Sequence, residues 1–275
     1  MSQDNIFLGT CGWSYKEWED NFYEKHCGQS KLRSYARIFK TAEIDSTFYR
    51  NPSKAAVMGW LKFSPADFFF TAKLPKTITH DKALGLRRDV KADLKEFLDL
   101  MLPLQQGGKL GCLLIQLPPK YCYNPKNLEE FFQMLDPRFR YAVEFRNLTW
   151  LLPETVTFKL LRQYEVAYTV VDEPLLPPEV HLTADFAYFR WHGHGKNIWF
   201  DYRYSEEELA PWVPKVQELA CKVKKVYGYF NNHYHGYAPE NCLQLLERLG
   251  LFSEEQKKAK SKTAIKQAQL GSFFG

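Results

Sequence analysis

Short runs of apolar residues recur along the chain at intervals of about 25 to 40 residues. Several of these runs are continuously apolar, as expected of strands that are covered on both faces of a parallel sheet. Polar and turn-forming residues bound each run. We therefore predict eight strands, over residues 6–12, 41–45, 68–74, 111–117, 141–145, 166–171, 187–193 and 226–231.

Segments with helical spacing of apolar residues separate most of these runs. We predict helices over residues 30–39, 53–60, 89–101, 127–135, 153–164 and 239–249. A further helix begins at Ser205, where the sequence Ser-Glu-Glu-Glu forms a capping box, and runs toward Cys221. The sixth connection, residues 172–185, contains three prolines and is expected to lack a full helix.

Eight strands alternating with helices predict a single (β/α)₈ barrel of the TIM type over residues 1–252. A doubly wound open sheet is the competing architecture, but no G-x-G-x-x-G sequence follows the first strand. Residues 253–275 contain few core-forming side chains and are predicted to form a flexible tail. Five lysines and two glutamates give this tail a charge of +3, out of +5 for the whole chain. Basic arms of this kind often contact nucleic acid or an acidic partner.

The composition excludes membrane and fibrous classes. Hydrophobic residues make up 45% of the chain and charged residues 25%, the balance of an ordinary globular protein. No apolar run approaches the ~20 residues that a membrane helix needs, and the first residues do not resemble a secretory signal. The six cysteines are scattered, without a C-x-x-C pair. We therefore predict a cytoplasmic protein that makes no membrane contact.

Polar residues follow nearly every predicted strand. In a barrel of this type the carboxyl ends of the strands carry the chemistry, and polar groups that point into the mouth must be paired or contact a ligand. Acidic and imidazole side chains at these positions are candidate acids, bases or ligands of a divalent metal. The candidate catalytic residues are Glu43, Glu144, Asp172 and His192. The alternative is a network in which these groups neutralise one another.

A second set of residues at the strand ends suits an anionic or planar ligand. Arginine and lysine hold phosphate or carboxylate groups, and Arg50 is a further cation nearby. Exposed aromatic rings provide a stacking surface for bases or sugars, although packing beneath loops explains such rings equally well. The candidate binding residues are Lys73, Gln116, Arg146, Arg190, Asn231, Asn232, Trp13, Tyr15 and Tyr49.

Alternation along a strand places residues two apart on one face. Glu144 and Arg146 therefore share a face, as do Arg190 and His192. If the seventh strand continues, His194 lies on the same face as His192 and the two could ligate a metal. The chain has no H-E-x-x-H, G-x-S-x-G or P-loop sequence, so a serine or cysteine nucleophile is not indicated.

Long ordered stretches resemble the YecE-like family, also called domain of unknown function 72. The matching stretches are GTCGWSYKEWEDNFY (9–23), FKTAEIDSTFYRNP (39–52), FFFTAKLPKTITH (68–80), LGCLLIQLPPKY (110–121), YAVEFRNLTW (141–150), VDEP (171–174), YFRWHGHG (188–195) and YFNNHYHGYAPEN (229–241). The resemblance implies a TIM barrel, in agreement with the strand pattern. It implies no particular activity.

The last residues of the sequence, QAQLGSFFG, resemble the peptide that binds PCNA-type sliding clamps. In one helical turn the leucine and the two phenylalanines would form a single apolar plug, and the glutamine would fill a polar pocket. The clamp-binding residues are Gln267, Leu270, Phe273 and Phe274. A tail that folds back on the barrel is the alternative. Clamp binding implies an archaeal or eukaryotic cell, with the protein at the nucleoid or in the nucleus.

These observations lead to a DNA-associated barrel that is recruited to a clamp and hydrolyses phosphodiesters in repair or processing. Two alternatives stay open. One is an enzyme that acts on a small phosphorylated or carboxylated metabolite, and the other is a non-catalytic module that binds nucleic acid. The sequence leaves the metal and any other cofactor unknown, and a divalent metal is the candidate.

Overall fold

The computed structural model describes residues 4–19, 21–23, 31–152, 154–254 and 256–258. All eight predicted strands are present, with bounds that differ by a few residues from those expected. They are β1 (Ile6–Thr10), β2 (Thr41–Ile44), β3 (Phe69–Lys73), β4 (Leu110–Gln116), β5 (Tyr141–Glu144), β6 (Ala167–Asp172), β7 (Phe186–Trp191) and β8 (Lys225–Phe230). The continuous apolar runs were a sufficient signal because every strand is buried on both faces.

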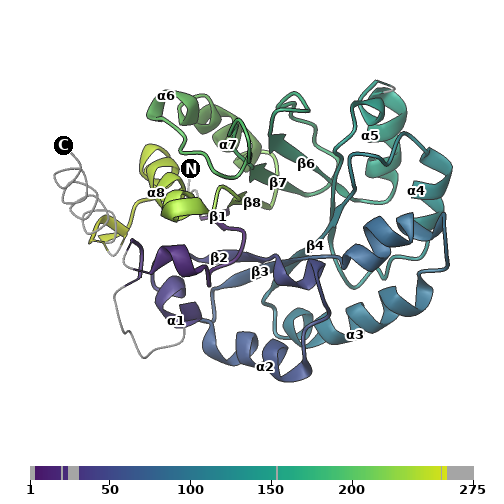
Figure 1. Ribbon diagram of the computed structural model, residues 1–275, viewed down its shortest axis with the longest axis horizontal. Coiled ribbons are helices and arrows are strands. Elements are labelled where there is room, and N and C mark those ends of the chain that lie inside the picture. Colours follow the sequence, from purple (N-terminus) through teal and green to yellow (C-terminus); the bar gives the residue numbers. More distant parts are fainter. Residues whose placement is uncertain (1–3, 20, 24–30, 153, 255, 259–275) are drawn as a thin grey trace.

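Helices connect the strands and cover the outside of the sheet (Figure 1). They are α1 (Lys31–Ala36), α2 (Lys54–Phe63), α3 (Lys91–Gln106), α4 (Pro125–Phe132), α5 (Glu154–Gln163), α6 (Glu206–Leu209), α7 (Trp212–Ala220) and α8 (Tyr237–Arg248). The described residues of the β6–β7 connection contain no helix, as predicted. No helix in the described ranges has both the length and the apolar character needed to cross a membrane.

The helix predicted from Ser205 is in fact two helices. Ser205 caps α6 through a complete capping box with Glu208, as the sequence indicated. Pro211 then stands between α6 and α7, and its backbone nitrogen has no proton to donate to the preceding turn. The chain therefore restarts at Pro211, which is a favourable position for proline at the beginning of a helix.

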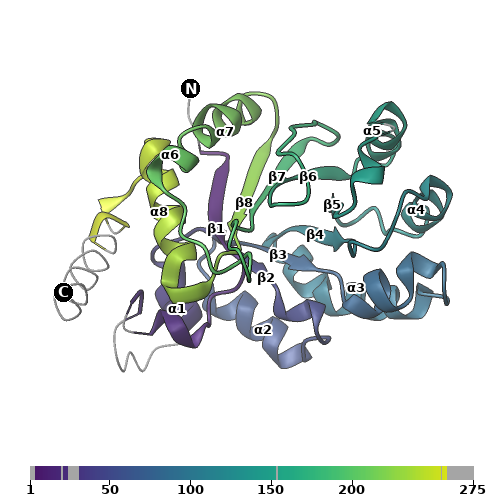
Figure 2. The same cartoon turned by 45° about the horizontal axis from the view of Figure 1, so that its top comes forward.

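The strands form one parallel sheet in the order β1-β8-β7-β6-β5-β4-β3-β2. Figure 2 shows β1, in purple, beside β8. The sheet curls so that its first and last strands also approach each other. Cys11, just beyond the end of β1, bridges to Glu43 within β2, and the backbone N–H of Gly12 donates to the Glu43 carbonyl at 2.8 Å. The result is a nearly closed (β/α)₈ barrel, which confirms the predicted fold.

A tyrosine hydroxyl fills the seam between β1 and β2. The backbone N–H of Thr10 donates to the Tyr35 hydroxyl at 2.9 Å, and this hydroxyl donates to the Thr41 carbonyl at 3.1 Å. Gly9 makes the close approach possible, because a Cβ atom there would lie 2.1 Å from the Thr41 carbonyl oxygen. Tyr35 of α1 thus provides a hydrogen-bond partner for the Thr10 N–H and for the Thr41 carbonyl. In a fully closed barrel these two backbone groups would pair with each other.

The interior of the barrel is filled in layers. At the amino ends of the strands, the rings of Phe7, Phe69, Phe186 and Tyr227 pack against one another. Above them, the Tyr188 hydroxyl contacts Thr71 Oγ1 at 2.8 Å, and the Tyr229 hydroxyl contacts Thr41 Oγ1 at 2.7 Å. Side chains therefore fill the lower part of the barrel, where Lys225 Nζ lies over the Phe69 ring at 3.6 Å. The network of Glu43, Glu144 and Arg190 occupies the layer nearest the carboxyl ends of the strands.

Candidate functional site

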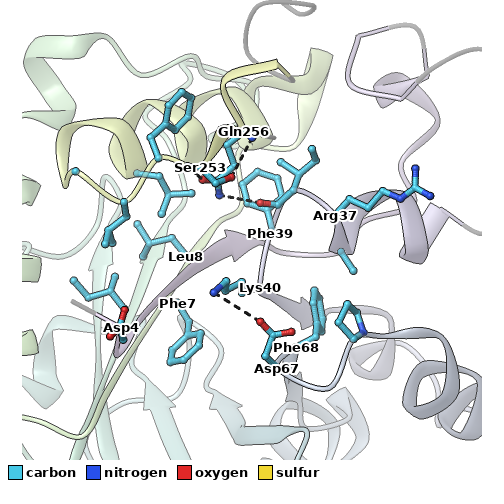
Figure 3. A pocket seen from close by; sticks show the side chains of 18 residues that line it. Asp4, Phe7, Leu8, Arg37, Phe39, Lys40, Asp67, Phe68, Ser253 and Gln256 are labelled. Carbon is cyan, nitrogen blue, oxygen red and sulfur yellow. Dashed lines mark hydrogen bonds and ion pairs between the residues drawn. The ribbon is translucent and has the colours of Figure 1, made fainter. Parts of the chain in front are cut away.

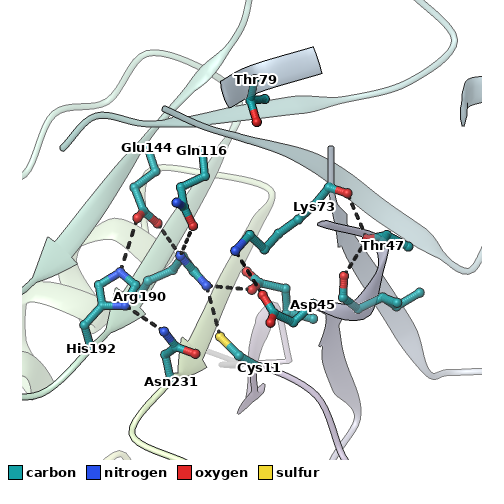
Figure 4. A network of polar contacts seen from close by, with 12 residues as sticks. Cys11, Asp45, Thr47, Lys73, Thr79, Gln116, Glu144, Arg190, His192 and Asn231 are labelled. Atoms are coloured by element: carbon teal, nitrogen blue, oxygen red, sulfur yellow. Dashed lines mark hydrogen bonds and ion pairs between the residues drawn. The ribbon is translucent and has the colours of Figure 1, made fainter. Parts of the chain in front are cut away.

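Arg190 lies at the centre of the upper layer of the barrel (Figure 4). Its Nη2 atom is 2.8 Å from Glu43 Oε1, and its Nη1 atom is 2.6 Å from Glu144 Oε2. All three side chains are fully buried. They come from β7, β2 and β5, so a single guanidinium joins strands on different sides of the barrel.

The electrostatics keep Arg190 and Glu144 charged. Burial alone would lower the pKa of Arg190, but Glu144 and Glu43 raise it well above its usual value. Burial would raise the pKa of Glu144, and Arg190 together with Arg146 instead holds it well below its usual value. Arg146 balances the second carboxylate, with Nε 2.7 Å from Glu144 Oε1. Tyr188 donates its hydroxyl proton to the other Glu43 oxygen at 2.7 Å.

His192 is a neutral member of the same layer. Asn231 Nδ2 lies 2.9 Å from His192 Nδ1, and Arg146 Nη2 lies 3.4 Å from His192 Nε2. The Nε2 atom also faces Glu144 Oε1 at 3.4 Å. Burial, reinforced by Arg146 and Arg190 against the opposing effect of Glu144, lowers the pKa of His192 to about 3. The imidazole is therefore uncharged near neutral pH.

Lys73 and Asp45 form a second ion pair at the mouth. Lys73 Nζ lies 3.0 Å from Asp45 Oδ1 and 4.2 Å from the centre of the Phe48 ring. Burial would raise the pKa of Asp45, but Lys73 and Arg190 lower it. Gln116 reaches the same layer, with Oε1 3.5 Å from Arg190 Nη1. Eight of the expected candidates are thus brought together at one end of the barrel: Glu43, Glu144, Arg146, Arg190, His192, Lys73, Gln116 and Asn231.

The carboxyl group of Glu173 has no partner in this layer, and among the described residues Arg190 Nε is another buried atom of the layer that has none. The Glu173 side chain is 3% exposed, and neither carboxylate oxygen has a hydrogen-bond partner within the described part of the chain. Burial raises its pKa to about 7, with smaller effects from Arg146, which lowers it, and Glu144, which raises it. Sequence reasoning passed over Glu173 in favour of its neighbour Asp172. The missed signal was register, because Val171 pairs with the inward-facing Arg190 and Glu173 lies two residues further on.

Asp172 lies on the opposite face of β6 and contacts a different histidine. Its Oδ1 atom is 2.8 Å from His194 Nε2. Strand β7 ends at Trp191, and Gly193 then turns the chain with φ of +91°. The expected same-face pair of His192 and His194 is therefore split between the buried layer and the surface. No group of three or more His, Cys, Asp or Glu side chains that could hold a metal occurs among the described residues.

The remaining candidates lie around this layer rather than in it. Asn232 donates to the Tyr202 carbonyl and to Asn241 Oδ1, both at 2.8 Å, and so ties two loops together. Tyr15 stacks on His233 with 4.5 Å between ring centres. Trp13 packs against Trp60. Tyr49, in contrast, is 68% exposed.

The structure has a large cavity at the opposite end of the barrel (Figure 3). Its volume is about 790 Å³, and it lies between the starts of β1 and β2, the end of α8 and the segment that follows α8. Gln256 anchors that segment by donating from Nε2 to the Ile38 carbonyl at 2.8 Å. Arg37, Lys40 and Asp67 are among its charged lining residues. None of the predicted site residues lines this cavity.

The clamp-binding candidates Gln267, Leu270, Phe273 and Phe274 lie outside the described residues. The boundary predicted after residue 252 stays a prediction. Ser253 and Gln256, which are on the tail side of it, contact each other, with the Ser253 N–H donating to Gln256 Oε1 at 2.7 Å.

Comparison with known proteins identifies relatives along nearly the whole chain. The profile of the family described as "Protein of unknown function DUF72" matches residues 7–267. The UPF0759 protein YunF of Bacillus subtilis is 27% identical over 272 residues, covering 90% of this chain and 95% of YunF. The UPF0759 protein YecE of Escherichia coli is 32% identical over 145 residues, covering 52% of this chain and 48% of YecE. The crystal structure of a DUF72 family protein from Thermotoga maritima is similar with a TM-score of 0.78 at 33% identity, covering 89% of this chain and 99% of that one.

Proposed function

The chain belongs to the DUF72 family of YecE-like proteins, and from the chemistry of its barrel mouth we propose that it is an acid–base enzyme acting on an anionic substrate. Glu173 is the proposed proton donor and acceptor. Arg146 and Lys73 are the proposed contacts to a phosphate or carboxylate group of the substrate. The other charged residues of the mouth hold these three in position.

The observation that carries the proposal is the unpaired carboxyl of Glu173. A buried polar group without a partner costs folding free energy, and native structures satisfy nearly all of them. The exceptions cluster at functional sites, as do carboxyls whose pKa lies far above the ordinary value. With a pKa of about 7, Glu173 is half protonated at neutral pH and can both give and take a proton.

The two proposed anion contacts have donors left for a ligand. Arg146 uses its Nε atom for Glu144, and its Nη2 atom lies 3.4 Å from His192 Nε2, so neither terminal nitrogen has a carboxylate partner among the residues described. Lys73 has three donors and directs one to Asp45. Arg190, in contrast, is fully buried and engaged on both Nη atoms, so in this proposal it organises the site without touching substrate.

Hydrolysis of a phosphate ester is the reaction class that we propose first. Ionised Glu173 takes a proton from water as the water oxygen bonds to phosphorus. The P–O bond to the leaving group breaks, and protonated Glu173 returns the proton to the departing oxygen. The residues of the mouth do not fit a divalent metal, since Glu43 and Glu144 both contact Arg190 and a cation would have to displace it. No step therefore involves a metal.

The natural substrate in this proposal is DNA, and a small phosphorylated or carboxylated metabolite is the second candidate. The sequence QAQLGSFFG supports DNA, because binding to a PCNA-type clamp would concentrate the barrel at sites of replication or repair. Titration calorimetry against such a clamp tests this part. We expect micromolar or tighter binding by the full chain and none by a chain truncated after Lys262. Equal heats from the two chains would leave the metabolite as the substrate class.

Turnover by two glutamate variants tests the acid–base assignment. The full chain would be assayed on bis(p-nitrophenyl) phosphate and on nicked, abasic and flapped DNA. Glu173→Gln should lose at least about 100-fold in rate, the usual contribution of a general acid or base. Glu179→Gln is the matched control, because Glu179 lies on the same β6–β7 connection but is exposed and contacts His181. Equal turnover by both variants would contradict the proposal and favour a non-catalytic binding module.

A further inference from the structure

Positive charge is concentrated on one half of the rim that surrounds the barrel mouth. The rim segments after β2, β3 and β4, taken through the first residues of α2, α3 and α4, are residues 45–54, 74–91 and 117–126. They contain nine basic and three acidic residues and so have a net charge of +6, against +5 for the entire chain. We call their basic residues the basic rim: Arg50, Lys54, Lys76, Lys82, Arg87, Arg88, Lys91, Lys120 and Lys126.

The basic rim is contiguous in space. Strands β2, β3 and β4 are neighbours in the parallel sheet, so their carboxyl ends meet at one edge of the mouth. Asn51 Nδ2 donates to Glu96 Oε1 at 3.1 Å, which joins the first rim segment to α3. Asn127 Nδ2 donates to the Leu84 carbonyl at 3.2 Å, which joins the second segment to α4.

Most of these cations have nothing to neutralise them. Seven of the nine have no carboxylate partner in the described ranges: Arg50, Lys54, Lys76, Arg87, Arg88, Lys91 and Lys120. Arg87 donates only to the His80 carbonyl. Elsewhere on the molecule, exposed basic residues such as Arg138 and Arg140 contact a carboxylate. Unneutralised charge of one sign on a single face indicates a polyanionic ligand.

Two of the three helices of this half, α2 and α4, begin with a charge that disfavours the helix, whereas α3 has Asp93 in its first turn. The amino end of a helix carries partial positive charge and favours acidic side chains. α2 begins at Lys54 and α4 carries Lys126 at its second position, and neither has an acidic residue in its first turn. On the other half of the rim, α6 begins with three glutamates and α8 contains Glu240 in its first turn. An anion held over the basic rim would remove this repulsion.

An exposed aromatic ring lies within the same surface. Tyr49 precedes Arg50 directly, and its ring packs edge-on against Phe48 with 5.2 Å between centres. Two-thirds of the Tyr49 side chain is nonetheless exposed to solvent. Proteins that bind single-stranded nucleic acid often combine basic residues with exposed aromatic rings, because the unpaired bases stack on those rings.

We infer that the basic rim binds the sugar-phosphate backbone of a single-stranded nucleic acid, with a base stacked on Tyr49. The arginines and lysines contact successive phosphates and lead the strand to the barrel mouth. This inference deepens the proposed function by naming the substrate class. The binding is separable from the chemistry, because the basic rim includes none of Glu173, Arg146 and Lys73, the residues proposed to act on the substrate.

Fluorescence anisotropy with the full chain tests the inference. Labelled single strands of DNA and RNA of about 20 nucleotides, and the corresponding DNA duplex, would be titrated over a range of salt concentrations. We expect single strands of at least one of the two sugars to bind more tightly than the duplex, with an affinity that falls steeply with salt. Absence of salt-dependent binding to either strand would overturn the inference, while leaving the Glu173 assay on small phosphate esters unaffected.

A matched pair of double variants locates the contact. Arg87→Ala with Arg88→Ala removes two charges from the basic rim, and Arg138→Ala with Arg140→Ala removes two at the opposite end of the barrel. Each phosphate contact to a single strand contributes about 0.7 to the salt slope, so the rim variant should lose about 1.4 of slope and roughly 25-fold in affinity at 0.1 M salt. The control variant should change neither. Equal behaviour of the two variants would contradict the assignment and leave the basic tail as the binding segment.

Substitution of Tyr49 separates stacking from charge. Tyr49→Ala should weaken single-strand binding by about tenfold without changing the salt slope, since stacking releases no counterions. Tyr49→Phe keeps the ring and should bind as the unmodified chain does. Equal affinities of the alanine and phenylalanine variants, or equal binding of duplex and single strand, would exclude the stacked single strand.

Discussion

Arg190 on β7 and Glu144 on β5 form an ion pair that is fully buried, with 2.6 Å between Nη1 and Oε2. Glu43 contacts the same guanidinium from β2. The charged layer of the barrel is thus organised around one arginine that has almost no exposure to solvent. The ion-paired side chains of this layer therefore stabilise the fold, whereas the unpaired carboxyl of Glu173 is available for chemistry.

Breaking this ion pair should destabilise the fold. Glu144→Gln leaves Arg190 with an unneutralised buried charge on one side, and losing one partner of a buried pair costs about 3–5 kcal/mol. Urea unfolding followed by circular dichroism measures the loss. Asp99→Asn is the control, because Asp99 forms an exposed pair with Lys95 and should cost at most about 1 kcal/mol. Similar midpoints for both variants would show that the buried network does not hold the barrel together.

The seam between β1 and β2 gives a second stability prediction. Tyr35→Phe removes the hydroxyl that satisfies the Thr10 N–H and the Thr41 carbonyl, and leaves both buried groups without a partner. We expect a loss of about 1–3 kcal/mol in the free energy of unfolding. Tyr49→Phe removes a hydroxyl from a mostly exposed ring and should change stability little. If the two variants unfold at the same urea concentration, the hydroxyl does not close the seam.

The fold could be predicted from sequence because its signal is local. Several strands are continuous apolar runs, and the residues of the capping box at Ser205 identify the start of a helix. The split at Pro211 was missed because apolar spacing continues across it. Which charges meet at the mouth followed from alternation, as with Glu144 and Arg146, but alternation alone does not say which face points inward.

Glu173 shows the limit of that reasoning. The inward face of β6 is set by its register with β7, which pairs Val171 with Arg190, and register depends on contacts between strands that are distant along the chain. The separation of His192 from His194 likewise depends on the positive φ of Gly193, where the strand has already ended. The basic rim could not be predicted from the sequence, because its residues come from three segments that the folded barrel brings together.

His192 should make stability depend on acid pH. Its folded pKa of about 3 lies below the ordinary value of about 6.5. The unfolded chain therefore binds the proton more strongly, and the stability present above about 6.5 is lost as the pH falls toward 3. His192→Gln should reduce the fall in stability between pH 6.5 and about pH 3, whereas substitution of the exposed His235 by Gln should not. Thermal unfolding between these pH values measures the stability of both variants. If neither variant changes the fall in stability at acid pH, burial of a neutral His192 is contradicted.

Glu173 should act in the opposite direction. Its folded pKa of about 7 lies above the ordinary value of about 4.5. The folded state then binds the proton more strongly, so stability is present below about 4.5 and is lost as the pH rises through 7. The full loss is about 3 kcal/mol, because a tenfold difference in proton affinity between the folded and unfolded states corresponds to about 1.36 kcal/mol. Glu173→Gln should not show this loss of stability, and it should be more stable than the unmodified chain at alkaline pH. A variant that is less stable than the unmodified chain at alkaline pH would contradict an unpaired carboxylate at this position.

The most direct test of the account is the titration of the Glu173 carboxyl itself. The ¹³C chemical shifts of the glutamate carboxyls would be followed by NMR from acid to alkaline pH, with Glu173→Gln used to assign the resonance. The account predicts one glutamate that titrates near pH 7 and is missing from the variant spectrum. A Glu173 resonance that titrates near the ordinary value of about 4.5 would show that this carboxyl is solvated or paired. The proposed acid–base function would then have lost its proton carrier.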